Sequence, residues 1–245
     1  MGKNRSCWGY SKGNLIQLDI ENYKESPIFY GRRKGRKLSK TGELSLKTGK
    51  KFLIRKEDLK NFFKLKKNIM LEIGFGDGEN LINSAKKNSE YFYIGADPFL
   101  NTTAKCLNKI TKYNLNNVMI WPDDIRKILD RFPFKSVSAI KILFPDPWPK
   151  KKHENRRLIQ NEFIEKIYQI TKPKGTITIA TDHDILKTWI LEKFQKYRKF
   201  EWIVKSAKDW QIRPNDCFET KYEIKAITQK RKPSWFIFKK KNIST

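Results

Sequence analysis

The sequence is poor in cysteine and histidine and has no long apolar run. Its three cysteines, Cys7, Cys106 and Cys217, lie about a hundred residues apart, which excludes a disulfide framework or a cysteine-based metal site and favours the reducing cytoplasm. With only His153 and His183 available, a zinc or iron site would need mostly carboxylates, and a hydrolytic triad would need one of these two as its base. No apolar run reaches the roughly 18 residues of a membrane span, and the basic N-terminus lacks the apolar stretch of a signal peptide. We therefore expect a cytoplasmic protein that neither enters a membrane nor uses a metal ion.

Acidic residues are scarce beside the basic ones: 26 Asp and Glu oppose 53 Lys and Arg, which gives a formal net charge of +27. The excess is concentrated in residues 1–66, 149–158 and 221–245, which carry net charges of +12, +4 and +7. Such asymmetry indicates a polyanionic ligand, and nucleic acid is the best match. An anionic lipid surface is the weaker alternative, because no basic run doubles as an amphipathic helix with bulky apolar residues on its other face.

The apolar pattern divides the chain into an arm and an α/β domain. Residues 1–54 contain a basic run at 31–37 and few periodic apolar positions, so we expect a basic, extended or mobile arm. From residue 55 to 245, short apolar runs alternate with helical periods, which predicts a Rossmann-like, mostly parallel twisted sheet with helices on both faces. Strands are expected at 69–73, 91–96, 118–121, 137–144 and 176–180, and helices near 79–88, 101–114, 124–131, 155–171 and 183–199. Two last runs, 222–227 and 235–238, are too close for a crossover helix and predict a C-terminal antiparallel hairpin.

A glycine-rich turn follows the first expected strand, in residues 70–79 (MLEIGFGDGE). Gly74 and Gly76 permit tight backbone angles and a close approach of a ligand to the main chain. A dinucleotide fold uses the same device, but Glu72 precedes the turn and no Lys or Arg lies in it, so a pyrophosphate would be repelled. S-adenosylmethionine, which carries a positive ammonium and a positive sulfonium, suits these charges better.

Two further acids follow the second and third expected strands. Asp97 can bridge ribose hydroxyls with its two oxygens, and Asp124 can accept a hydrogen bond from an adenine amino group. The alternative for Asp124 is that it merely caps the helix expected at 124–131.

The fourth expected strand ends in residues 144–153 (FPDPWPKKKH). Three prolines restrict the backbone around Asp146, and the carboxyl edge of an open α/β sheet is where ligands bind. Arg156 and Arg157 are expected in the first turn of the next helix, where cations oppose the helix dipole unless a phosphate docks there. Among the histidines, His153 fits a phosphate or sugar contact and His183 a structural role.

Together these segments resemble the bacterial tRNA (guanine-N7)-methyltransferases. The resemblance covers about residues 55–240 and is carried by LEIGFGxG, FPDPWPKKxHxxRRL, TDH and TKYE. It implies a class I methyltransferase that uses S-adenosyl-L-methionine to form 7-methylguanosine at position 46 in the tRNA variable loop. The cofactor-binding residues it implies are Glu72, Gly74, Gly76, Asp97, Asp124 and Asp146. The residues it implies for guanine or tRNA contact are Lys150, Asp182, Thr220, Lys221, Tyr222 and Glu223. Those it implies for the RNA backbone are Lys152, His153, Glu154, Asn155, Arg156 and Arg157.

Asp146 is the expected catalytic residue. Guanine N7 has an in-plane lone pair and no proton, so methylation needs orientation and charge stabilisation rather than a base. Two alternatives remain, an amino-group methyltransferase of RNA or DNA and a non-catalytic basic RNA-binding protein. A binding measurement with S-adenosylmethionine distinguishes the RNA-binding protein from an enzyme, because a protein that only binds RNA should not bind this cofactor. The expected assembly is a monomer or a homodimer.

Overall fold

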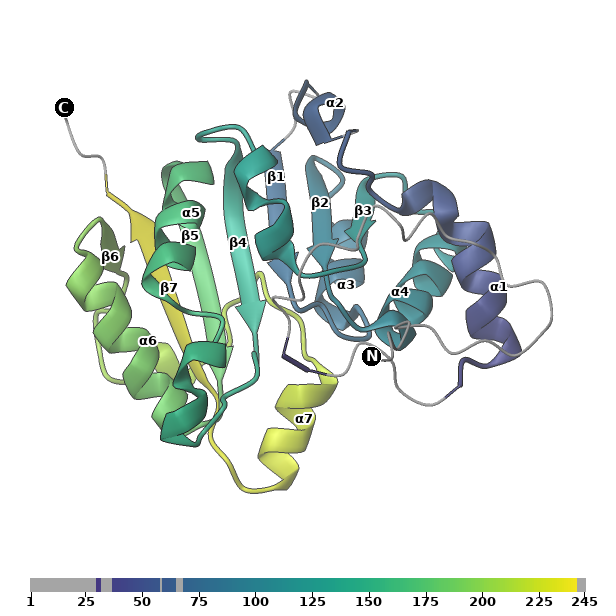
Figure 1. Cartoon of the computed structure of the whole chain (residues 1–245). Helices are drawn as coiled ribbons and strands as arrows, with labels where there is room; N and C mark the ends of the chain where they lie inside the picture. Colours follow the sequence, from purple (N-terminus) through teal and green to yellow (C-terminus); the bar gives the residue numbers. More distant parts are fainter. Residues whose placement is uncertain (1–29, 32–36, 58, 65–67, 242–245) are drawn as a thin grey trace, which may run out of the picture.

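The computed structural model describes residues 30–31, 37–57, 59–64 and 68–241. Within these residues a seven-stranded sheet has the order β3-β2-β1-β4-β5-β7-β6 (Figure 1). Five strands are parallel, and β7 runs antiparallel to both β5 and β6. The strands are β1 (Asn68–Ile73), β2 (Tyr91–Ala96), β3 (Val118–Trp121), β4 (Val137–Leu143), β5 (Thr171–Thr181), β6 (Phe200–Trp202) and β7 (Ser234–Lys240). The prediction of a mostly parallel sheet with an antiparallel C-terminal part is confirmed.

Helices cover both faces of the sheet (Figure 1). One face packs against α5 (Asn161–Ile170) and α6 (Asp184–Tyr197), and the other against α3 (Glu79–Lys87) and α4 (Leu100–Lys112). Alternate residues of β1 enter the two cores, because successive strand side chains point to opposite faces: Leu71 packs in the first and Met70 in the second. No helix in the described part of the chain is long and apolar enough to cross a membrane.

The end of the expected arm is folded. Residues 1–29 and 32–36 lie outside the described residues. Beyond them, α1 (Lys40–Thr48) and the 3-10 turn η2 (Gly49–Phe52) pack against α4. Ser39 caps α1 by accepting a hydrogen bond from the Gly42 amide at 3.1 Å. The short helix α2 (Leu59–Lys64) follows before the sheet begins. The described part of residues 37–54 is therefore part of the packed structure and not extended.

The strand expected at 222–227 is wrong, because this segment forms helix α7 (Lys221–Thr228). The side chain of Thr220 accepts a hydrogen bond from the Glu223 amide at 3.2 Å and caps the helix. Thr220 and Glu223 have the spacing of a capping box, a signal in the sequence that outweighs the β-branched and aromatic composition. The partner of β7 at the edge is instead β6, a strand of three residues.

Two expected helices also differ from the structure. The segment 124–131 forms two short 3-10 turns, η3 (Ile125–Lys127) and η4 (Leu129–Arg131), rather than one helix. The helix expected at 155–171 begins only at Asn161 and is preceded by a 3-10 segment, η5 (Lys151–Arg156). A further 3-10 turn, η6 (Asp209–Gln211), precedes α7. Arg156 and Arg157 thus do not lie in the first turn of an α-helix, so their charges do not oppose a helix dipole there.

Candidate active site

A cavity of about 370 Å³ lies at the carboxyl edge of the parallel strands. Gly74 and Gly76 bound it from the turn after β1, Asp97 from the end of β2, and Asp146 from the loop after β4. Its volume is within the roughly 300–1,000 Å³ of small-molecule sites. The topology therefore brings together acids that are far apart in the sequence.

The glycine-rich turn is made by three residues with left-handed backbone angles. Gly74, Gly76 and Gly78 have φ values of +77°, +55° and +81°, which L side chains adopt only with strain. A Cβ at Gly78 would lie 2.9 Å from the Cys106 sulfur, and one at Gly76 would lie 3.2 Å from the Tyr222 ring. Glycine at these two positions lets the turn fit against both α4 and α7.

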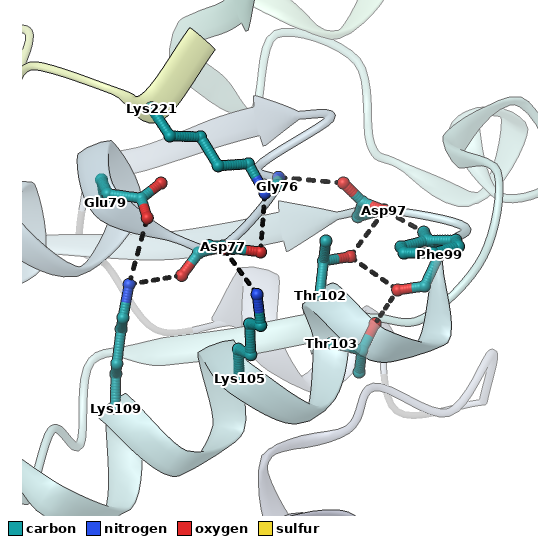
Figure 2. Close-up of polar contacts among 10 residues, drawn as sticks. All are labelled: Gly76, Asp77, Glu79, Asp97, Phe99, Thr102, Thr103, Lys105, Lys109 and Lys221. Carbon is teal, nitrogen blue, oxygen red and sulfur yellow. Dashed lines mark hydrogen bonds and ion pairs between the residues drawn. The ribbon is translucent and has the colours of Figure 1, made fainter. Parts of the chain in front are cut away.

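Asp97 ties this turn to the next loop (Figure 2). Its Oδ2 accepts a hydrogen bond from the Gly76 amide at 2.9 Å, and its Oδ1 accepts from the Phe99 amide at 2.8 Å and the Thr102 hydroxyl at 3.1 Å. Burial raises the pKa of Asp97 to about 6, although these hydrogen bonds favour the charged form. The carboxylate also lines the cavity, where its oxygens can accept bonds from the hydroxyls of a ligand.

Asp77, a residue that the sequence analysis did not single out, connects the turn to two helices (Figure 2). Its carboxylate pairs with Lys105 of α4 at 2.8 Å and with Lys221 of α7 at 2.8 Å. Lys109 donates to the Asp77 carbonyl at 2.6 Å and lies 3.4 Å from Glu79. Burial alone would raise the pKa of Asp77, but the two lysines outweigh it and hold the pKa below its usual value.

Glu72 is buried behind the turn, and the cavity lining does not include it. Its carboxylate accepts a hydrogen bond from Asn80 Nδ2 at 2.6 Å, and it is the cross-strand neighbour of the buried Lys141. Burial raises the pKa of Glu72 to about 7, while Asn80 and Lys141 act in the opposite direction. Asn80 also accepts from the Phe218 amide at 2.8 Å. Glu72 thus belongs to a buried network that holds the segment before α7 against the sheet.

Asp124 has the capping role considered for it, and it also lies at the cavity, where it stays a candidate for cofactor binding. It caps η3 by accepting from the Arg126 amide at 2.9 Å and pairs with the Arg126 guanidinium at 2.6 Å, and it also lines the cavity. Its neighbour Asp123, which the sequence analysis did not single out, lines the cavity as well and pairs with Lys127 at 2.8 Å. Asp123 and Asp124 therefore line the same cavity, where either could contact a bound ligand.

The loop after β4 has an unusual backbone. Phe144 and Trp148 have φ values of +55° and +40°, which are uncommon for bulky residues. Asp146 lies between them, lines the cavity and has a pKa raised by burial. The Trp148 ring meets the His153 ring edge-on with centroids 5.7 Å apart, and the Arg156 guanidinium lies 5.1 Å from the Trp148 ring. The loop therefore contributes an acid and an aromatic ring to the lining of the cavity.

The basic run after this loop divides into exposed and buried residues. Lys150 precedes η5, and the η5 residues, which include Lys152, His153, Glu154, Asn155 and Arg156, are all at least partly exposed. Arg157, which the resemblance implies for the RNA backbone, is only 4% exposed. Its guanidinium donates to the backbone carbonyls of Pro147 and Trp148. In this structure Arg157 is not available to an RNA phosphate, which corrects that expectation.

The residues of the TKYE motif have different surroundings. Thr220 caps α7, Lys221 pairs with Asp77, Tyr222 lines the cavity, and Glu223 is buried 3.6 Å from the Arg213 guanidinium. Tyr222 is thus the residue of this motif that lies at the cavity, while the contacts of the other three hold α7 in place.

The Thr-Asp-His segment after β5 lies at the same sheet edge. Asp182 forms an ion pair with Arg231. The His183 carbonyl accepts from the Leu186 and Lys187 amides at 3.0 Å each, so His183 has a structural role at the start of α6. Among the described residues, no group of three or more His, Cys, Asp or Glu side chains is placed to hold a metal ion.

Several known proteins with similar sequences carry the same enzyme name. A family model described as a putative methyltransferase matches residues 66–235. A tRNA (guanine-N(7)-)-methyltransferase of Rhodospirillum rubrum is 33% identical over 231 residues, which cover 90% of this chain and 91% of the relative. The enzyme of the same name from Hyphomonas neptunium is 39% identical over 182 residues, covering 74% of this chain and 83% of the relative.

The fold is similar to that of solved methyltransferase structures. The 16S rRNA methyltransferase KamB has a TM-score of 0.56 and is 11% identical, with 77% of this chain and 94% of that chain covered. An antibiotic-related methyltransferase has a TM-score of 0.52 and is 18% identical, with coverage of 76% and 94%. At these identities the similarity concerns the sheet and its helices alone.

Proposed function

The chain belongs to the tRNA (guanine-N7)-methyltransferase family, and we propose that its site methylates guanine 46 in the variable loop of tRNA. The observation that carries the proposal is the position of Asp146: it shares one cavity with the glycine-rich turn, on the sheet edge that also carries the exposed basic run. A methyl donor and an RNA base can meet there. We further propose a cytoplasmic enzyme that acts as a monomer or a homodimer.

The cavity fits S-adenosyl-L-methionine, the methyl donor of this enzyme. Gly74 has open space where a Cβ would stand, so the main chain can contact a ligand directly. Asp97 has carboxylate oxygens at the cavity to accept from ribose hydroxyls, and Asp123 or Asp124 can accept from the adenine amino group. When bound, the cofactor supplies an electrophilic methyl group on a positively charged sulfur. Glu72 would support this site from behind, through Asn80, rather than by direct contact.

Asp146 is proposed as the catalytic residue. N7 of guanine attacks through its own lone pair, so the protein has no proton to remove. Positive charge develops on the purine ring, and the Asp146 carboxylate can accept from ring or exocyclic N–H groups and stabilise that charge. The partly apolar surroundings that raise its pKa also strengthen this interaction.

The remaining motif residues are proposed to orient the base and the RNA. Tyr222 lines the cavity next to the glycine-rich turn, and Asp182 and Lys150 follow strands that end at the same sheet edge. The exposed residues of η5 carry positive charge toward solvent, where phosphates can bind.

Labelled methyl transfer to bulk tRNA, followed by nucleoside analysis, tests the proposal. We expect the label in 7-methylguanosine, mapped to position 46 by chemical cleavage at the modified base. A transcript with adenine at position 46 is the matched control and should accept no label. Label on an amino nitrogen would indicate an amino-group methyltransferase, and tRNA binding without transfer would indicate a non-catalytic RNA-binding protein. Either result would overturn the proposal.

A further inference from the structure

The loop that carries Asp146 is short of backbone hydrogen-bond donors. Pro145, Pro147 and Pro149 have no N–H group. Its carbonyl oxygens must therefore find donors elsewhere if they are to be satisfied inside the protein. The positive φ at Trp148 adds a cost that surrounding contacts have to offset.

Arg157 supplies these donors. Its Nε donates to the Pro147 carbonyl at 3.2 Å, and its Nη2 donates to the Trp148 carbonyl at 3.2 Å. The guanidinium lies 4.5 Å from the centre of the Trp189 ring, which fixes its plane. Trp189 is itself held by a 2.7 Å hydrogen bond from its indole N–H to the Ile159 carbonyl. The loop backbone is thereby connected to α6 through a single arginine.

The adjacent arginine has different surroundings. Arg156 is partly exposed and lies over the rings of Trp148 and Tyr30, at 5.1 and 5.6 Å. It lines the cavity and is partly exposed, so a phosphate can reach it. Two consecutive arginines in one basic run thus contact the same loop differently, Arg156 through the Trp148 ring and Arg157 through backbone carbonyls.

We propose that Arg157 is a positioning residue for methyl transfer: its forked hydrogen bonds to the Pro147 and Trp148 carbonyls hold the loop that presents Asp146, and it makes no RNA contact. This inference rests on the proposed function, since its effect is read in the rate of methyl transfer. Only a planar fork can bond both carbonyls while stacking on Trp189, so lysine is not an equivalent residue.

The test compares R157Q and R157K with R156Q and R131Q. The last of these removes one exposed arginine at the other end of the sheet and is the matched control for charge. For each folded variant we would measure the single-turnover rate at saturating cofactor and tRNA, and the slope of log tRNA affinity against log salt.

We expect both Arg157 variants to react at least about tenfold more slowly, because a misplacement of about 1 Å can cost a hundredfold. Their salt slopes should equal that of the wild type. R156Q should flatten the slope by about 0.7–0.9, the value of one phosphate contact. R131Q should keep the wild-type rate. A slower rate at unchanged cofactor affinity indicates a positioning role, because a general loss of structure would weaken cofactor binding as well.

Three outcomes would overturn the inference: a flattened salt slope in R157Q, a wild-type rate in R157Q, or a wild-type rate restored by R157K. If R157Q does not fold, the inference is tested with R157K and W189F. W189F should also react more slowly than the wild type. Wild-type protein that forms no 7-methylguanosine would instead refute the proposed function, so the two failures are distinguishable.

Discussion

Asp77 in the glycine-rich turn and Lys221 at the start of α7 form an ion pair of 2.8 Å (Figure 2). The turn proposed to contact the cofactor and the motif proposed to contact the substrate are therefore linked directly, through two side chains that lie far apart in the sequence. The same carboxylate pairs with Lys105, which places the turn between α4 and α7.

A double-mutant cycle with D77N and K221Q should measure this link. We expect a coupling of about 0.5 kcal/mol in urea unfolding at pH 7, small because the Lys221 side chain is 39% exposed to solvent. The pKa of Asp77 is lowered in the folded state, so the coupling should be present above the unfolded pKa and disappear as the pH falls through the folded one. The pair D130N and K221Q, with no shared contact, should be additive. Additivity in the Asp77 cycle as well would show that the ion pair contributes nothing.

Asp146→Asn should affect turnover much more than tRNA binding, because the charge it stabilises forms only in the transition state. We expect a fall of about a hundredfold in the single-turnover rate, similar to the loss of one oxyanion-hole donor. The measurement is the rate at saturating cofactor and the tRNA dissociation constant, with the exposed Asp184→Asn as control. In the wild type the rate should also fall as Asp146 is protonated, at a pH above the usual range for aspartate, since burial raises its pKa. An unchanged rate in Asp146→Asn would remove it from the mechanism.

Glu72 should make stability depend on pH. Its pKa is about 7 in the folded protein against 4.5 unfolded, so the folded state binds the proton more tightly. The contribution of Glu72 to the free energy of unfolding is therefore fully present below about pH 4.5 and is lost as the pH rises through about 7. Because of this group, the free energy of unfolding of the wild type should fall by on the order of 2 kcal/mol between pH 5 and pH 8, and E72Q should not show this fall. Urea unfolding of both proteins at the two pH values checks this. Parallel pH dependence in E72Q and wild type would contradict it.

The affinity for tRNA should fall steeply with salt. If six to ten phosphates are neutralised, affinity should drop by about 10³–10⁵ between 50 and 200 mM salt on duplex RNA segments, and somewhat less on single strands. Filter binding or fluorescence anisotropy across this range gives the slope. The double variant R156Q/R157Q should flatten the slope by no more than R156Q does, because Arg157 is buried. A twofold greater flattening in the double variant would mean that both arginines reach the RNA.

The sequence by itself was sufficient for the five parallel strands and for the edge that carries the site. Buried parallel strands are nearly continuous apolar runs, as in β1, where residues 69–73 are apolar except for Glu72, and this pattern can be recognised in the sequence. Because the carboxyl ends of such strands share one edge, the proximity of Asp97 and Asp146 also followed. The conformation of α7 was available in the sequence as the capping box of Thr220 and Glu223, but the β-branched composition of the segment favoured a strand.

Only the tertiary structure decided which charged side chains can contact a ligand and which are bound within the protein. Arg156 and Arg157 are chemically identical neighbours, and their difference arises because a donor-poor loop and Trp189 surround one of them. Likewise, the burial of Glu72 beside Lys141 depends on strand register and on the segment that covers it. The free energy of a charge depends on its surroundings, and distant parts of the chain supply those surroundings. Local sequence could therefore identify the basic run and the acids, but not which of them face a ligand and which hold the protein together.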